Sequence, residues 1–166
     1  MSEVLQFSPH GAPPPSEFDL NDLVPEVCDG LERESLRRRV SLEADVPPYT
    51  ILRADRDKVR LLLGRALSAV LTMAPPGSQA VVTAEIEEGE VEIEIALTRA
   101  KLRGQPGGQA SASQDQIQAV WSDVRRMATE LGSQLSLADA GQSGMVCTLR
   151  FPRVTDEEME SQKAAA

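Results

Sequence analysis

Aromatic residues are scarce in this chain, making up 3% of its 166 residues, with a single tryptophan and a single tyrosine. Its core must therefore be built from the Leu, Val, Ile and Ala that supply most of the 41% hydrophobic content. The chain has one histidine and two cysteines, Cys28 and Cys147, which lie far apart and outside any CxxC spacing. A zinc site and a disulfide framework are therefore not expected, and both cysteines are interpreted as small core residues.

Long apolar runs and an excess of positive charge are also missing. No stretch approaches the roughly 20 apolar residues of a membrane span, and the N-terminus lacks the basic and apolar parts of a secretory signal. Acidic residues outnumber basic ones by 26 to 17, which gives a net charge of -9. Because such a surface repels a phosphate backbone, neither nucleic acid nor a membrane is expected as a partner. The sequence predicts a cytoplasmic protein.

The length fits one domain with tails. Residues 1–16 contain three consecutive prolines and predict an extended, solvated leader. Residues 103–114 are rich in Gly, Ser and Gln, which is typical of a flexible loop. Residues 154–166 form an acidic tail with few large apolar residues. The folded part is therefore expected at residues 17–153, with the loop inside it.

Apolar periodicity indicates the elements of this folded part. Spacings of three and four residues predict helices over 22–37, 59–71 and 117–131, with Asp55 as the N-cap of the second and Trp121 in the core-facing stripe of the third. Alternating apolar residues predict strands at 40–44, 50–53, 82–86, 91–97, 135–137 and 145–151. The order predicts an α/β (α+β) two-layer sandwich, with a mixed, mostly antiparallel sheet covered on one face by three helices.

Four stretches of this pattern resemble one known family. They are FDLNDLV at 18–24, ADRDKVRLLLGRALSAVLTMAPPG at 54–77, VEIEIALTRAKL at 91–102 and VRRMATELGSQLSLADAGQSGMVCTLRFP at 124–152. The stretches are similar, in order, to the start, the second helix, the strand of the first glycine box, and the last helix with its closing strands in the ATP-binding domain of sensor histidine kinases. The resemblance to this GHKL, or Bergerat, type of domain covers about residues 18–153.

The residues that hold magnesium and ATP in that family are replaced here. The second helix of the family presents two asparagines four residues apart, the second of which gives an oxygen to magnesium, and a lysine often follows. The matching residues are Arg65, Ala69 and Thr72. Since Ala69 has no side-chain oxygen and magnesium requires oxygen ligands, the resemblance implies that this contact is lost.

The groups around the base and the phosphates are replaced as well. The family's D-x-G-x-G run, whose carboxylate binds the adenine amino group, matches Leu97, Arg99 and Lys101. The second glycine box, whose backbone amides hold phosphates at a helix start, matches a stretch with Gln118 and Val120 in place of two glycines. The resemblance therefore implies a degenerate site with no cofactor, no metal and no catalytic residue.

The leading hypothesis is a non-catalytic pseudo-kinase adaptor in a bacterial two-component-type pathway. The vacated site and its rim would bind a signalling protein, such as a receiver domain or a kinase, or a second copy of the chain. The partner-binding candidates are Arg65, Arg99 and Lys101, which place positive charge where an anionic ligand binds in the family.

Two alternatives stay open. One is a divergent histidine kinase or anti-sigma-type kinase that still binds nucleotide. The other is a phosphotransfer-type protein with separate phosphoacceptor helices. The only histidine, His10, lies among prolines that prevent a helix, and it is not expected to be a phosphoacceptor.

Overall fold

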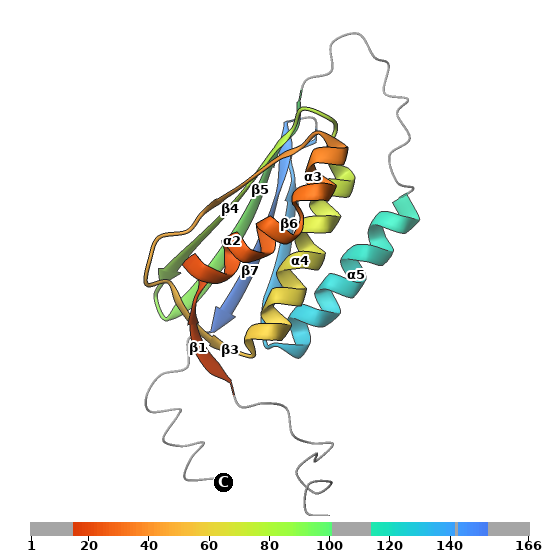
Figure 1. Ribbon diagram of the computed structural model, residues 1–166. Helices are drawn as coiled ribbons and strands as arrows, with labels where there is room; N and C mark the ends of the chain where they lie inside the picture. Colours follow the sequence, from red (N-terminus) through yellow and green to blue (C-terminus); the bar gives the residue numbers. More distant parts are fainter. Residues whose placement is uncertain (1–14, 101–113, 142, 153–166) are drawn as a thin grey trace, which may run out of the picture.

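The structure is a computed structural model that describes residues 15–100, 114–141 and 143–152. A five-stranded sheet forms one layer, and the helices form a second layer on one of its faces (Figure 1). The strands follow the order β2-β4-β5-β7-β6, and their bounds are β2 Ser41–Asp45, β4 Gln79–Glu87, β5 Glu90–Thr98, β6 Gln134–Asp139 and β7 Gly144–Pro152. Only β2 and β4 pair in parallel. The predicted mixed, mostly antiparallel sheet is confirmed.

The helical layer contains four helices within the described residues, rather than three. They are α2 Leu20–Gly30, α3 Glu32–Arg38, α4 Arg56–Met73 and α5 Gln114–Glu130. The single helix predicted over 22–37 is wrong, because the chain leaves helical geometry at Leu31, with φ -104° and ψ 7°. Gly30 is a weak helix former, so the helix breaks there at low cost and Leu31 packs against the core.

A short strand at the start of the domain was not predicted. Strand β1 (Ser16–Asp19) pairs antiparallel with β3 (Ile51–Ala54) in a separate two-stranded sheet. The Asp19 carboxylate accepts hydrogen bonds from the backbone amides of Asn21, Tyr49 and Thr50, at 2.8–3.1 Å. This side chain therefore caps α2 and ties its start to the beginning of β3.

The second long helix forms as the sequence predicts. The Asp55 side chain accepts hydrogen bonds from the backbone amides of Asp57 and Lys58 and caps the start of α4. The apolar stripe of α4 is buried, from Val59 to Leu71. The chain leaves the helix at Ala74, before two consecutive prolines that cannot continue it.

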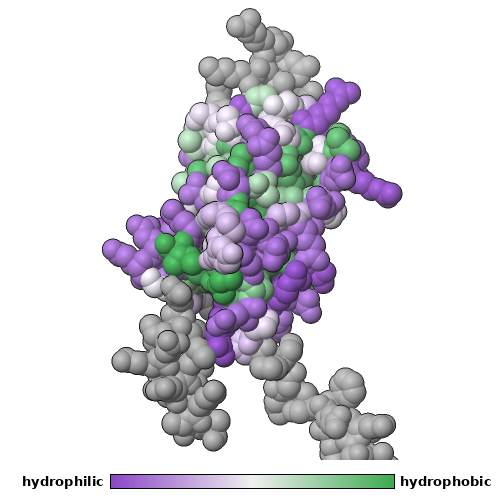
Figure 2. All heavy atoms as spheres, turned by 60° about the vertical axis from the view of Figure 1, so that its left-hand side comes forward, coloured by the Kyte–Doolittle hydropathy of each residue, from purple (hydrophilic) through white to green (hydrophobic). Residues whose placement is uncertain are grey.

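The sheet is buried on one face only. In β5, Val91, Ile93 and Ile95 lie in the core, whereas the alternating glutamates point to the open face. On the face shown in Figure 2, hydrophilic residues cover much of the described surface, and the hydrophobic residues gather in small separate groups. In the described ranges, the exposed large hydrophobic side chains are Leu36, Tyr49, Leu61, Ile86, Val120 and Leu137.

Several sequence predictions concern residues outside the described ranges. They include the leader up to residue 14 with His10, the loop at 103–113, Lys101 and the acidic tail. Gln114, assigned to the loop from sequence, begins α5. No helix among the described residues is long and apolar enough to cross a membrane.

Candidate functional site

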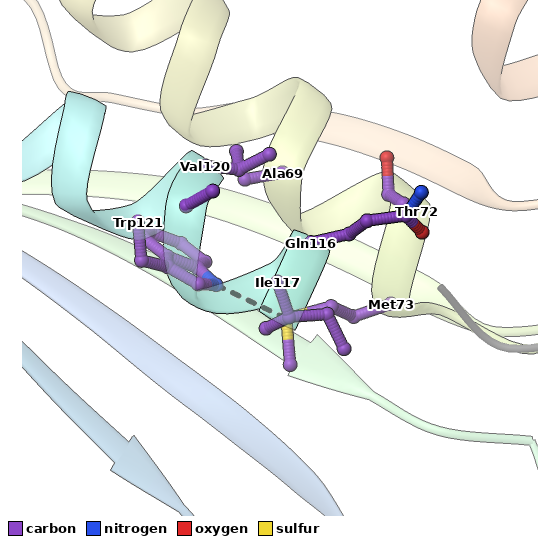
Figure 3. Close-up of a pocket in the computed structure, with 8 residues that line it drawn as sticks. Ala69, Thr72, Met73, Gln116, Ile117, Val120 and Trp121 are labelled. Carbon is purple, nitrogen blue, oxygen red and sulfur yellow. Dashed lines mark hydrogen bonds between the residues drawn. The ribbon is translucent and has the colours of Figure 1, made fainter. Parts of the chain in front are cut away.

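A pocket lies between α4 and α5, which run in opposite directions across the sheet (Figure 1). Its volume is about 400 Å³. The C-terminal turns of α4 form one wall and the N-terminal turns of α5 form the other (Figure 3). The lining residues are Ala69, Thr72, Met73, Gln116, Ile117, Ala119, Val120 and Trp121.

Among the described residues that line this α4–α5 pocket, none has a charged side chain. Two polar side chains, Thr72 and Gln116, take part in the lining. The Thr72 hydroxyl donates a hydrogen bond to the Ser68 carbonyl at 2.9 Å, so its oxygen remains available only as an acceptor. The Trp121 indole N–H donates to the Met73 sulfur at 3.2 Å, and a thioether is a weak acceptor. The pocket is therefore apolar, with few polar groups at defined positions.

The structure brings together several residues singled out from the sequence. Ala69, Thr72 and Val120 all line the α4–α5 pocket. Gln118 lines a neighbouring pocket of about 360 Å³ between α5 and the β6–β7 hairpin. Leu97 is buried on the inner face of β5, in the core cluster. Three residues assigned to the degenerate nucleotide site by resemblance thus lie around one pocket beside the N-terminal half of α5, and Gln118 lines the neighbouring pocket.

The candidates for positive charge do not gather in the same way. Arg65 is exposed on α4, and its guanidinium lies 3.7 Å from the Asp123 carboxylate of α5. Asp123 also accepts a hydrogen bond from Arg126 in the same helix. This ion pair bridges the two helices beyond the pocket and is one turn of α4 away from Ala69.

Arg99 is directed toward the β6–β7 turn. Its Nη1 donates to the Asp139 carboxylate at 3.0 Å and to the Gly141 carbonyl. The hydrogen bond from Arg99 lowers the pKa of Asp139 below its usual value, and a hydrogen bond from the Gly141 amide adds to this effect. Arg99 is not part of the lining of either pocket beside α5. Within the described residues, the charge of Arg99 is thus used to hold a hairpin turn.

The pocket depends on residues that the sequence analysis did not single out. Met73, Gln116 and Ala119 were not assigned a role, and Ile117 and Trp121 were assigned only to the apolar face of the predicted third helix. Trp121 is indeed buried, but one edge of its ring borders the pocket. Met73 could have indicated the pocket from the sequence, because it is a large apolar residue that lies beyond the predicted apolar stripe of the second helix.

The described walls offer few of the groups that hold magnesium or nucleotide phosphates. Magnesium takes oxygen ligands and phosphates are held by amides or cations, whereas the described walls offer only the Thr72 hydroxyl and the Gln116 amide among methyl groups, a thioether and an indole. No cluster of three or more His, Cys, Asp or Glu side chains within residues 15–100, 114–141 and 143–152 is arranged to hold a metal ion. The side chains present favour a neutral occupant.

Comparisons with known proteins identify the fold. No protein-family model matches the chain, and no curated protein matches it. Among solved structures, the catalytic domain of histidine kinase ThkA is similar at a TM-score of 0.67 and 16% identity, covering 84% of this chain and 97% of that domain. Histidine kinase AdeS from Acinetobacter baumannii gives a TM-score of 0.69 at 12% identity, covering 89% of this chain and 71% of AdeS. Full-length ShkA in complex with AMPPNP gives 0.68 at 17% identity, covering 91% of this chain and 34% of ShkA. The chain therefore has the fold of the catalytic domain of histidine kinases.

Proposed function

We propose that the chain is a non-catalytic regulatory module in a bacterial two-component-type pathway, acting in the cytoplasm through a protein partner. The observation that carries the proposal is the apolar wall of the α4–α5 pocket. ShkA, which shares the fold, was solved with AMPPNP bound. In this chain, Ala69 occupies the position where the family resemblance calls for a magnesium ligand, and the charged Arg99 is bonded to a hairpin turn.

Calorimetric titration with Mg-ATP and with Mg-AMPPNP tests the loss of nucleotide binding. We expect no saturable heat up to millimolar nucleotide. The reason is that Ala69 has no side-chain oxygen that could bind magnesium. Far-UV circular dichroism of the same samples verifies that the protein is folded. A Kd in the micromolar range would contradict the proposal and favour the alternative of a divergent, nucleotide-binding kinase.

The partner surface is proposed next to the pocket, around the Arg65–Asp123 pair that bridges α4 and α5. Both side chains are accessible, with 65% and 33% of their surfaces exposed. Exposed ion pairs contribute little to stability, typically less than about 1 kcal/mol, so a partner can replace this one without unfolding the domain. Arg65, and by the family resemblance Lys101, would then face acidic groups of a receiver domain or a kinase, while Arg99 stays with the hairpin.

Site-specific photo-crosslinking tests this surface. A photoreactive residue in place of Arg65 is expected to capture a receiver domain or a kinase in a native lysate, identified by mass spectrometry. The same residue in place of Arg150, an exposed side chain of β7 that pairs with Glu92 on the open sheet face, is the matched control. Equal capture from both positions, or capture only of a second copy of the chain, would contradict the proposal.

A further inference from the structure

The α4–α5 pocket has the size of a small-molecule site. Its volume of about 400 Å³ lies within the range of about 300–1,000 Å³ that is common for ligand pockets. Such pockets are mostly apolar, with a small number of polar groups that orient the ligand. This description applies to the side chains of Ala69, Ile117 and Val120 together with the Trp121 indole (Figure 3).

Among the described residues, some apolar side chains beside α5 are exposed. Two of the six exposed large hydrophobic side chains in the described ranges, Val120 and Leu137, border the two pockets that flank this helix. Met73, Ile117 and Trp121 line both pockets and separate them. Since Met is flexible and adapts its shape easily, a shift of Met73 would enlarge the space available to an occupant.

One hydrogen-bond donor in the pocket has a poor partner. The Trp121 indole N–H is bonded to the Met73 thioether sulfur, as the dashed line in Figure 3 shows. Neutral oxygen acceptors such as carbonyls bind N–H groups better than a thioether does. An occupant with one such oxygen would improve this bond, whereas a charged group would lose its hydration without gaining a partner ion in the lining.

We propose that the α4–α5 pocket binds a neutral, largely apolar small molecule that carries a carbonyl-type acceptor. The Trp121 N–H donates to this acceptor, and Ala69, Ile117 and Val120 surround the apolar body of the ligand. The proposal goes beyond the regulatory function proposed above, because it assigns a ligand class that differs from a nucleotide and from a protein. It requires neither a metal nor a conformational lid.

Fluorescence provides a direct test, since Trp121 is the only tryptophan in the chain. The probe is prodan, a neutral naphthalene with one ketone. We expect saturable quenching of Trp121 emission by prodan, a blue shift of prodan emission, one site per chain, and a Kd below about 100 μM. The anionic naphthalene sulfonate ANS is expected to bind at least about tenfold more weakly, because the lining offers its charge no partner.

Variants test whether prodan binds in the α4–α5 pocket. Ala119→Phe fills the space from an exposed position of α5 that lines it, and should weaken prodan binding at least about tenfold. Ala138→Phe is the matched control, since Ala138 is exposed on β6 and lines neither pocket beside α5. Trp121→Phe removes the donor, and prodan emission should then report an affinity about two- to tenfold lower.

Several results would overturn the proposal. They are the absence of saturable quenching, equal loss of binding in Ala119→Phe and Ala138→Phe, or ANS binding as tightly as prodan. Mg-ATP is added to the prodan complex as a separate arm. Displacement of prodan by micromolar Mg-ATP would contradict the proposed loss of nucleotide binding, whereas failure of prodan to bind would leave that function untouched. The two ideas can therefore fail independently.

Discussion

Helix α5 is packed very differently along its two halves. In the closed half, residues 123–130, Val124 and Ala128 are completely or almost completely buried. The Arg125 guanidinium also donates to the Leu135 carbonyl at 3.3 Å, which fastens this half to β6. In the open half, residues 114–122, Val120 is 42% exposed, and pockets lie on both sides of the helix.

The comparison shows that a helix can be held by one half of its apolar stripe while the other half stays available for binding. Both halves continue the same apolar spacing, so the sequence pattern does not distinguish them. The difference arises from the neighbours: the closed half is bonded through Arg125 to Leu135 near the start of β6, whereas the open half faces the last turns of α4, where a pocket lies between the two helices. An apolar surface that lacks cover is a common feature of binding sites.

The largest expected effect tests the difference between the halves directly. Val124→Asp places an unpaired carboxylate in the core and should reduce the free energy of unfolding by about 3–5 kcal/mol. Val120→Asp, four residues earlier on the same helix, should change it by less than about 1 kcal/mol, because the position is accessible to water. Urea denaturation followed by circular dichroism measures both. Similar losses in the two variants would mean that the open half is packed as tightly as the closed half.

The next largest effect concerns the end of the sheet near the open half. Gly144, the first residue of β7, has φ +156°, and an added Cβ would lie 2.0 Å from the Leu97 carbonyl oxygen. Gly144→Ala should therefore destabilise the protein by about 1–3 kcal/mol. Gly64→Ala in α4 is the opposite case, since nothing lies within 4 Å of the new methyl group. It should stabilise the protein by about 0.5–1 kcal/mol through helix propensity. Thermal denaturation of both variants measures whether each change in stability has the expected sign. A Gly144→Ala variant as stable as the unchanged protein would refute the close approach of β7 to β5.

The Arg99–Asp139 pair tests whether the hairpin beside the open half depends on pH. Arg99 keeps the pKa of Asp139 low, so the stabilisation from this pair is present above the carboxyl's unfolded pKa and is lost as pH falls through its lower folded pKa. Arg99→Met should cost about 1 kcal/mol or less at neutral pH, because Asp139 is more than half exposed. The loss of stability caused by Arg99→Met should become smaller at acidic pH. Arg60→Met, which removes an exposed i,i+3 pair with Asp57 on α4, is the control and should have a smaller effect. A cost that is constant from neutral to acidic pH would exclude a contribution from the Asp139 charge.

Much of the fold was predictable because it depends on local periodicity. The buried stripe of α4, its Asp55 cap and the alternation in β5 are determined by residues that are close in sequence. Two predictions were wrong at positions where contacts with residues distant in sequence determine the structure. Ile86 follows the inward alternation of β4 but is exposed, because β2 ends at Asp45 opposite Thr83 and leaves that part of β4 without a neighbour on one side. The break at Leu31 has no proline to announce it.

The site was predictable in part. The family resemblance assigned Ala69, Thr72 and Val120 to one site, and the structure places them around one pocket. The direction of Arg99 could not be foreseen, since its partner Asp139 lies 40 residues further along the chain. Nor does a sequence pattern reveal a gap between two apolar stripes, because the gap depends on how closely two helices approach.

The smallest effect is on chemical reactivity rather than stability. Burial raises the pKa of the Cys147 thiol to about 12, although the nearby charge of Arg125 acts in the opposite direction. Burial raises the pKa of Cys28 to about 11, and the charge of Asp29 adds to the shift. Since the thiolate is the reactive form, both cysteines should react slowly with a thiol reagent at pH 8, and Cys147 more slowly than Cys28.

The labelling rate of Cys147 also reports on the helix above it. Cys147 belongs to β7 and lies close enough to Arg125, in the closed half of α5, to be affected by its charge. In a Cys28→Ser background, reaction at Cys147 therefore requires opening of the packed part of the sheet–helix interface. We expect Val120→Asp to leave this rate within about twofold of the background protein, and Val124→Asp to raise it by more than about tenfold, because opening becomes easier by more than about 1.4 kcal/mol. If Val120→Asp accelerated labelling as strongly, the two halves of α5 would open together, and the open half could not accept a ligand independently of the core.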